Sequence, residues 1–283
     1  MHIEPDGGWT YSCFNCNHKA RFVPGENLSR AAKVLLRGFG LSDDDLNLIN
    51  IESVKIRGLL NYIEKPQIIY RRPEFKPIAE LPGELVDPAN PAHAFAIDYL
   101  RDRQIDFTKL PFLVDLTAER PGVIIPFSID GMVVGYTTRF LDDRRPKYLS
   151  VQPEGYVYGL DFQQDEWNTA IVVEGPFCAM SINGIATMHQ VMSPEQLLFI
   201  KSLGKEIIIV PDQNVSGMEM IEQAINEGFS VSIPEWHPGI EDVNEAVKVY
   251  GRLGALLTIL ANKESNPIKI DIRRKALAQR LLA

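Results

Sequence analysis

The chain has 283 residues, of which 45% are hydrophobic, so it is long and apolar enough for two or three small domains with packed cores. Its net charge of −8 argues against a protein that coats nucleic acid indiscriminately, although a local basic groove stays open. It has no apolar run of 18 residues, no signal-peptide pattern and only three cysteines. We therefore expect a cytoplasmic protein in a reducing compartment, with no membrane partner.

The N-terminus combines aromatic residues with a closely spaced cysteine pair. Cys13 and Cys16 form a C-x-x-C turn that resembles half of a zinc ribbon, in which two thiolates face one metal ion. Structural zinc needs four ligands, and His18 and His2 are further candidates nearby. Residues 1–25 are thus interpreted as a partial zinc-ribbon-like segment. With no second cysteine pair for its Zn²⁺ site, we expect either that the start of the chain is truncated or that the ribbon is degenerate.

Two helical patterns and a proline-rich stretch follow. Apolar residues repeat at helical spacing within residues 26–63, with Ser42 as the cap of the second helix, which indicates a small helical unit. Residues 64–90 are interpreted as one segment, and six prolines fall between Glu64 and Pro91. That density prevents regular helix and indicates an extended linker or a strap over the surface.

A mixed α+β segment is predicted for residues 91–165. Asn90 and Pro91 have the residue types that cap and start a helix. Residues 122–139 are typical of two strands joined by the tight turn Asp130-Gly131.

Three short apolar runs stand out between residues 166 and 250. They cover residues 171–173, 207–210 and 231–233. Their β-branched content and their Gly and Pro boundaries are typical of buried parallel strands. Helical patterns separate them: Ser193 opens one with a capping box, and Gly228 ends another. The pattern predicts an α/β domain in which helices flank a parallel sheet.

Acidic residues follow each of these runs, namely Glu174, Asp212 and Asp242. Because the carboxyl ends of parallel strands meet at one edge of a sheet, we expect the three side chains to converge. Clustered carboxylates repel one another, and a hard cation such as Mg²⁺ or Mn²⁺ relieves that repulsion. Such a site suits phosphoryl chemistry. The alternative is an ordinary α/β domain with acids at its strand ends.

The last segment, residues 251–283, is basic, with seven Lys and Arg residues against two acids. A basic amphipathic end is typical of a surface that binds a partner or nucleic acid. A final packing helix with a solvated basic face explains the same composition equally well.

The acidic motifs together carry a family resemblance. Glu174-Gly175, then Asp212-x-Asn214-x-x-Gly217, then Glu241-Asp242 resembles the TOPRIM domain of primases and topoisomerases. The block upstream of them is also informative: Arg139 ends a strand, a Pro-Lys-Tyr-Leu segment follows, and a Tyr-Gly-Leu leads into the first TOPRIM strand. This block is similar to that of bacterial replicative and tailed-phage DNA primases. The resemblance covers residues 120–250 well and 9–25 loosely.

The resemblance implies roles for individual residues. Glu174 would be the general base or an acid that orients the metal, with Asp212 and Asp242 as Mg²⁺ ligands and Asn214 and Glu241 as helpers. Asn214 stands where the family usually has an acid, which implies weaker cation binding. In the upstream block the implied nucleotide-binding and template-binding residues are Arg139, Lys147 and Tyr148.

The implied function is that of a DNA primase, which joins ribonucleoside triphosphates into short RNA primers on a single-stranded DNA template. A replicative helicase is the expected partner, in the cytoplasm of the bacterial host if a phage encodes the chain. Two alternatives stay open. One is a TOPRIM nuclease that uses the same acids for hydrolysis. The other is a catalytically weak accessory protein that binds DNA or a helicase.

Overall fold

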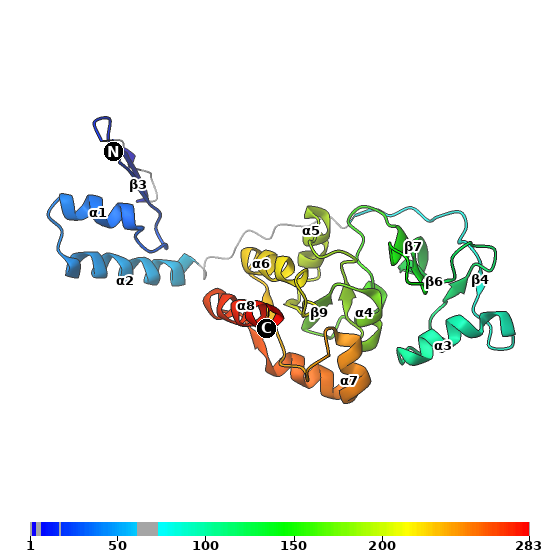
Figure 1. Cartoon of the computed structure of the whole chain (residues 1–283). Coiled ribbons are helices and arrows are strands. Elements are labelled where there is room, and N and C mark those ends of the chain that lie inside the picture. The colour runs from blue at the N-terminus through cyan, green and yellow to red at the C-terminus, as the bar shows by residue number, and fades with distance from the viewer. Residues whose placement is uncertain (1, 4–6, 17, 61–72, 283) are drawn as a thin grey trace. The chain divides into compact units, whose positions relative to one another are not determined.

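The computed structural model describes residues 2–3, 7–16, 18–60 and 73–282. The chain divides into two compact units, residues 1–69 and 70–283 (Figure 1). Within the described residues, no helix has both the length and the apolar character that crossing a membrane requires.

The smaller unit joins a small antiparallel sheet to two helices. Its elements are β1 (His2–Ile3), β2 (Trp9–Ser12), β3 (Lys19–Phe22), α1 (Arg30–Gly38) and α2 (Asp43–Leu60). Ser29 and Ser42 accept backbone N–H groups at the starts of the two helices, so the cap predicted at Ser42 forms and Ser29 caps α1 in the same way. Ala20 from the sheet and Ala32 and Leu46 from the helices are buried in one small core. The ribbon-like segment and the helices therefore share a single hydrophobic centre.

The proline-rich stretch is a strap where the structure describes it. Its first part, residues 64–72, lies outside the described residues. Beyond it the Phe75 ring packs against the rings of Tyr156 and Phe199, and the Ile78 N–H donates to the Val133 carbonyl. These contacts tie the described part of the stretch to the larger unit.

One half of the larger unit is built on a five-stranded antiparallel sheet, in the order β4-β5-β6-β7-β8. The strands are β4 (Glu84–Leu85), β5 (Leu113–Val114), β6 (Gly122–Ile129), β7 (Met132–Phe140) and β8 (Tyr148–Val151). The short 3₁₀ turn η1 (Pro91–His93) leads into α3 (Ala94–Asp102), and the side chain of Asn90 caps it as predicted. Asp130 and Gly131 both have positive φ, which is the conformation that a two-residue hairpin turn requires.

The other half is an α/β layer around a mixed sheet in the order β10-β9-β11-β12-β13. A second 3₁₀ turn, η2 (Leu160–Phe162), precedes it. Its strands are β9 (Thr169–Val173), β10 (Ile185–Ala186), β11 (Glu206–Ile209), β12 (Ser230–Ser232) and β13 (Lys263–Glu264). The first four are parallel and β13 is antiparallel, so the predicted parallel sheet is confirmed and gains two short edge strands.

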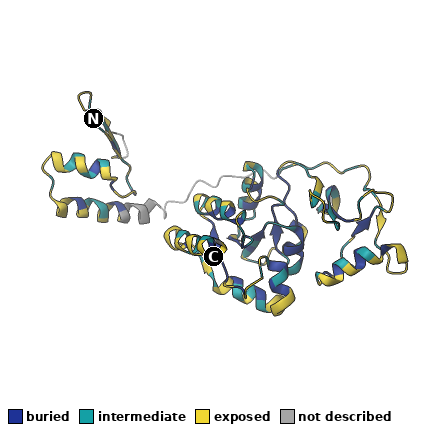
Figure 2. Ribbon diagram, viewed as in Figure 1, coloured by how far each residue is buried: buried dark blue, intermediate teal, exposed yellow. Residues whose placement is uncertain are grey.

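The connecting helices are α4 (Pro176–Ile182), α5 (Pro194–Ser202) and α6 (Gly217–Glu227). The predicted capping box at Ser193 and the left-handed Gly228 after α6 are both present. From β9 the chain moves to β10 on one side and then returns to β11 on the other. Right-handed crossovers therefore place α4 on one face of the sheet and α5 and α6 on the opposite face. Buried residues concentrate in this sheet and on the inner sides of its helices (Figure 2).

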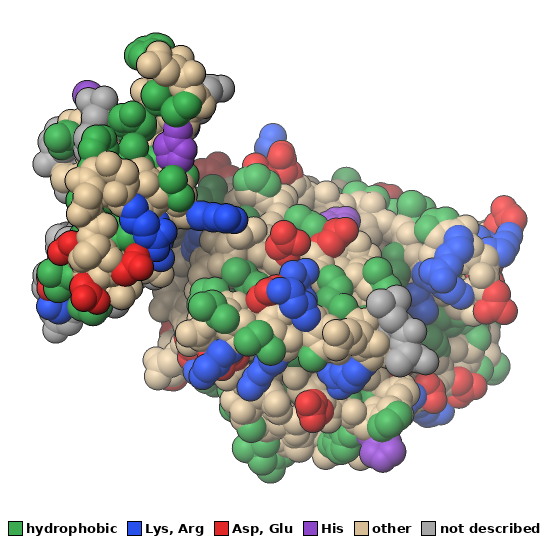
Figure 3. Space-filling view, turned by 60° about the vertical axis from the view of Figure 1, so that its left-hand side comes forward, with side chains coloured by type: hydrophobic (Ala, Val, Ile, Leu, Met, Phe, Trp, Pro, Cys, Tyr) green, Lys and Arg blue, Asp and Glu red, His purple; other side chains and the backbone are tan. Residues whose placement is uncertain are grey.

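The basic C-terminal segment is part of this layer. The helix α7 (Val243–Ala261) kinks at Gly251, β13 extends the sheet, and α8 (Pro267–Leu282) packs against α6. Ile270 and Leu277 of α8 are buried in the main core. On the face shown in Figure 3, Lys and Arg side chains are scattered among acidic and apolar ones. The burial of Ile270 and Leu277 supports the packing-helix interpretation of residues 251–283.

The buried side of α8 should therefore contribute to stability, whereas its exposed side should not. Leu277→Ala should lower the free energy of unfolding by about 2–5 kcal/mol, because it removes a fully packed side chain. The matched control Ile272→Ala changes an exposed residue of the same helix and should stay within about 0.5 kcal/mol of the parent. Urea titration measures both, and equal effects would show that α8 is not anchored in the core.

Candidate active site

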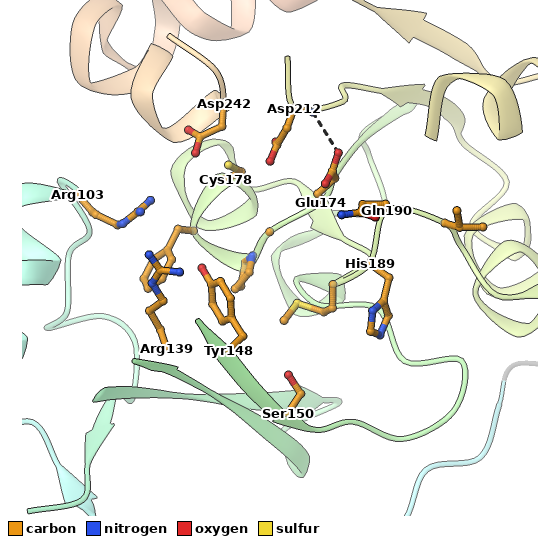
Figure 4. A pocket seen from close by; sticks show the side chains of 15 residues that line it. Arg103, Arg139, Tyr148, Ser150, Glu174, Cys178, His189, Gln190, Asp212 and Asp242 are labelled. Carbon is orange, nitrogen blue, oxygen red and sulfur yellow. Dashed lines mark hydrogen bonds between the residues drawn. The ribbon is translucent and has the colours of Figure 1, made fainter. Parts of the chain in front are cut away.

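The main cavity of the larger unit has a volume of about 600 Å³ and lies between the two sheets (Figure 4). One wall comes from the mixed sheet and carries Glu174, Asp212 and Asp242. The opposite wall comes from the antiparallel sheet and the end of α3, and it carries arginine and tyrosine side chains. The cavity thus opens where parallel strands end, which is the usual ligand position in such sheets.

The strand order explains why the acids meet. The chain reverses its direction of travel between β9 and β11, and neighbouring strands at such a switch point leave a crevice beyond their carboxyl ends. Glu174 follows β9 and Asp212 lies just beyond β11, so they occupy the two sides of that crevice. The Asp212 N–H donates to Glu174 Oε1 over 3.4 Å (Figure 4). The three predicted acids line one cavity.

Asp242 is fixed by the helix that follows it. It is the N-cap of α7, and its Oδ1 accepts the Glu245 N–H at 2.7 Å. The helix dipole favours a carboxylate at this end. Cys178, on the buried inner side of α4, lines the same cavity.

Close packing explains why the Asp212-x-Asn214-x-x-Gly217 motif ends in a glycine. Gly217 begins α6 directly against the Asp212 carbonyl, and a Cβ there would lie 2.1 Å from that oxygen. Asn214, between them, is turned to the helix instead of the cavity. Its Oδ1 accepts the Gly217 N–H at 3.0 Å and the Ser216 hydroxyl, so it caps the first turn of α6.

Negative charge at the acidic wall is poorly compensated by the protein. Burial, reinforced by the charges of Glu174 and Asp242, raises the pKa of Asp212 to about 8. Burial also raises the pKa of Glu174 and that of Asp242. The wall therefore favours a bound cation or proton near neutral pH.

The opposite wall is organised by a cross-strand pair. Arg139 of β7 lies directly across from Tyr148 of β8, and its guanidinium sits 4.7 Å from the centre of the tyrosine ring. The Arg139 Nε also donates to the Tyr99 hydroxyl at 3.2 Å. Arg139 and Tyr148 both line the cavity, as the sequence predicted, but the guanidinium already covers one face of the Tyr148 ring.

A third cation, Arg103, lines the cavity and was missed by the sequence analysis. It stands in the charged run Arg101-Asp102-Arg103 at the end of α3, where no spacing distinguishes it. Burial opposes its charge, yet the nearby phenol groups of Tyr99 and Tyr148 and the Asp242 carboxyl raise the pKa of Arg103. The guanidinium is thus a permanent positive charge facing the acids.

Three predicted residues do not line the cavity. Lys147 donates to the Asp142 carbonyl at 2.8 Å and lies 3.7 Å from Asp143. Glu241 is exposed, and Asn214 caps α6. The cavity is instead completed by residues to which the sequence analysis gave no role, Cys178 from α4 and His189 and Gln190 at its rim (Figure 4).

The donor set of the acidic wall fits a hard cation. Among the described residues, no group of three or more His, Cys, Asp or Glu side chains forms a ready-made metal cage. Mg²⁺ rarely requires one, because it keeps several waters and binds through one or two carboxylates together with substrate phosphates. Glu174, Asp212 and Asp242 supply oxygen donors and the negative charge that such an ion would neutralise.

The cysteine pair of the smaller unit forms a tight turn. The Cys13 N–H donates to the His18 carbonyl, and hydrogen bonds from Cys16 and the Asn15 N–H lower the pKa of Cys13 to about 7. The His18 ring is engaged with the Ala31 carbonyl at 3.1 Å. The described residues therefore present two thiols and no complete four-ligand zinc site.

Comparison with known proteins gives these features a context. No model of a protein family matches the chain. A DNA primase of Clostridium acetobutylicum is 28% identical over 153 residues, a match that covers 47% of this chain and 25% of that protein. The chain thus spans about a quarter of the length of this curated relative.

Solved structures extend the likeness to the fold. The RNA polymerase domain of the Mycobacterium tuberculosis primase DnaG matches with a TM-score of 0.54 at 18% identity, over 68% of this chain and 85% of that domain. The fold is that of a primase RNA polymerase domain. A DNA primase domain from Pseudomonas aeruginosa has a TM-score of 0.53 at 18% identity, over 62% of this chain and 74% of that one. The predicted primase resemblance and α/β fold class are confirmed.

In this primase fold, the acidic wall should make stability depend on pH. The pKa of Asp212 is about 8 in the folded protein and close to 4 in an unfolded chain. The folded state is therefore penalised as pH rises from about 4, and the penalty is complete above pH 8. Asp212→Asn removes it, so in EDTA the variant should melt above the parent at pH 9, with the gap closing toward pH 4.

Thermal unfolding at the two pH values measures this effect, with Asp143→Asn as the control because Asp143 is a fully exposed acid outside the cavity. Added Mg²⁺ should raise the melting temperature of the parent at pH 9 but not that of Asp212→Asn. A gap independent of pH would show that the Asp212 charge is not the source of the penalty.

Proposed function

We propose that the chain is a DNA primase that joins ribonucleoside triphosphates into short RNA primers on a single-stranded DNA template. The observation that carries this proposal is the main cavity, where an acidic wall faces two arginines at the switch point of a sheet with the primase fold. The mixed sheet with its helices is accordingly assigned as a TOPRIM domain. The antiparallel sheet and α3 form the subdomain that completes the site.

The acidic wall is assigned to the cation and the attacking group. Glu174, Asp212 and Asp242 would hold Mg²⁺ or Mn²⁺, which supplies charge neutralisation at the phosphate when it is bound. Glu174 also has the raised pKa that suits a general base, which would take the proton of the attacking 3′ hydroxyl. The bond between that oxygen and the α-phosphorus forms, and pyrophosphate leaves with the electrons of the broken bond.

The opposite wall is assigned to substrate phosphates. Arg139 and Arg103 place two guanidinium groups on the wall across the cavity from the acids, and guanidinium groups bind phosphate oxygens in a planar fork. The Arg139 guanidinium stacks on one face of the Tyr148 ring, so Tyr148 is assigned the role of holding Arg139 in place. Lys147 lies outside the cavity and is assigned to the template backbone.

The presence of an arginine wall opposite the acidic wall favours primer synthesis over phosphodiester hydrolysis. A nuclease needs only the acids and a water molecule, whereas two cations opposite the acids match the extra charge of a triphosphate. A single-stranded template would have to reach the same cavity, and a replicative helicase is the partner that delivers such a strand. Both belong to the proposal.

Glu174→Gln tests the chemistry, because the amide keeps the shape of the side chain and removes its charge. With single-stranded DNA, labelled ribonucleotides and Mg²⁺, the parent should make short RNA products and the variant should make at least 100-fold fewer, as expected when a general base is lost. The matched control Glu241→Gln alters an exposed acid of the same sequence motifs and should stay near the parent. DNA nicking without triphosphates would favour the nuclease, and a Glu174→Gln yield close to that of the parent would sink the assignment.

A zinc ion at Cys13 and Cys16 is the second part of the proposal, as a structural ion of the smaller unit. Two thiols hold zinc weakly, since a structural site has four ligands. The purified protein should therefore contain less than one zinc per chain, and Cys13→Ser should abolish it. Cys178→Ser is the control, because Cys178 belongs to the larger unit. One tightly bound zinc per chain, measured by metal analysis, would show that further ligands complete the site.

A further inference from the structure

A buried amide lies behind the arginine wall of the main cavity. Asn244, in the first turn of α7, is 1% exposed and does not line the cavity. Its Oδ1 accepts a hydrogen bond from Arg103 Nη1 at 3.0 Å. Its Nδ2 donates to the Arg103 carbonyl at 2.9 Å and to the Ser181 hydroxyl at 2.8 Å. One side chain thus joins α7, α4 and the segment after α3.

Arg103 has little freedom left once these bonds form. Its Nε donates to the Tyr99 hydroxyl at 2.8 Å, and its guanidinium lies 5.3 Å from the ring centre of Tyr99 and 5.0 Å from that of Phe177. Among the described residues, no protein acceptor is recorded for Nη2. The group is therefore held on two of its nitrogens and presents the third to the cavity that it lines.

The amide is chemically suited to this task. Asn244 uses one acceptor and two donors at the same time, and a carboxylate in its place has no donors. A carboxylate would also bring another negative charge close to Asp242, which is already penalised by burial. The position thus requires a neutral side chain that both donates and accepts.

We propose that Asn244 is a positioning residue: it holds the guanidinium of Arg103 in the cavity, so that Nη2 meets a phosphate group of the substrate. The inference rests on the proposed function for the identity of that phosphate. The competing role for an Asn two residues after Asp242 is a cation ligand. Its burial behind the cavity wall and its three hydrogen bonds to protein groups argue against that role.

A neighbouring contact provides a matched control. Lys248, one turn further along α7, pairs with Asp102 at 3.0 Å and joins the same two elements. This pair is more exposed and does not contact Arg103. Lys248→Met therefore weakens the link between α7 and the end of α3 without releasing the guanidinium.

The experiment compares the parent with Asn244→Ala, Asn244→Asp, Arg103→Met, the double variant Asn244→Ala/Arg103→Met, and Lys248→Met. The first readout is the side-chain ¹⁵N NMR signal of Arg103 in protein labelled at arginine. In Asn244→Ala its Nη protons should exchange with water at least ten-fold faster than in the parent. In Lys248→Met the rate should be unchanged.

The second readout is steady-state primer synthesis. Asn244→Ala should raise KM for the triphosphate about ten-fold, with the Mg²⁺ concentration for half-maximal rate unchanged within two-fold. In the Arg103→Met background the same change should add nothing, because the two residues act as one unit. Asn244→Asp should also lose activity, whereas a cation ligand would tolerate this change and bind Mg²⁺ more tightly.

The outcomes separate the inference from the proposed function. If the parent makes no primers, the proposed function is wrong, and the Arg103 exchange rate still decides whether Asn244 holds the guanidinium. If primers are made but the effects of Asn244→Ala and Arg103→Met multiply, or the Mg²⁺ requirement rises, the positioning role is overturned. An unchanged exchange rate in Asn244→Ala overturns it in either case.

Discussion

Repulsion among three carboxyl groups at one edge of the mixed sheet is the constraint on which the site depends. Glu174, Asp212 and Asp242 lie in the same cavity, and burial raises the pKa of each. A protein without a cationic ligand in this place would gain stability by replacing Asp212 with a neutral residue. Retaining all three acids costs stability, and a cation bound as proposed would offset that cost.

The rest of the larger unit holds the three carboxyl groups opposite the arginine side chains of the other cavity wall. The antiparallel sheet places Arg139 and Tyr148 as a cross-strand pair, and Arg103 is the C-cap of α3. Asn244 of α7 accepts a hydrogen bond from Arg103, which lies 141 residues earlier in the chain. Asp242 and Asn244 both belong to the start of α7. The first turn of this helix therefore fixes the Asp242 carboxyl group on one wall and holds the Arg103 guanidinium on the other. Negative and positive walls are thereby set in register before any ligand arrives.

Local sequence signals were sufficient for the elements that generate the site. The β-branched runs became β9, β11 and β12, the capping box at Ser193 formed, and the Asp130-Gly131 turn joined two strands. Strands β10 and β13 were not predicted, because two residues are too few for any periodicity. The acids were found because a strand end is visible in sequence, and parallel strands bring their ends together.

The missing parts of the site depend on tertiary contacts. Arg103 resembles its charged neighbours in sequence, and only a partner far along the chain singles it out. Asn214 and Lys147 were predicted from motif positions, yet local hydrogen bonds turn them away from the cavity. A motif therefore indicates which residues are near the chemistry, while the geometry decides which of them contact it.

The most direct test of this account is a crystal structure of the chain soaked with Mn²⁺ and a ribonucleoside triphosphate. If the proposed site is correct, an anomalous scattering peak for manganese should lie against Glu174, Asp212 and Asp242, with triphosphate oxygens close to Arg103 and Arg139. A triphosphate bound outside the main cavity, or manganese held away from all three acids, would contradict it.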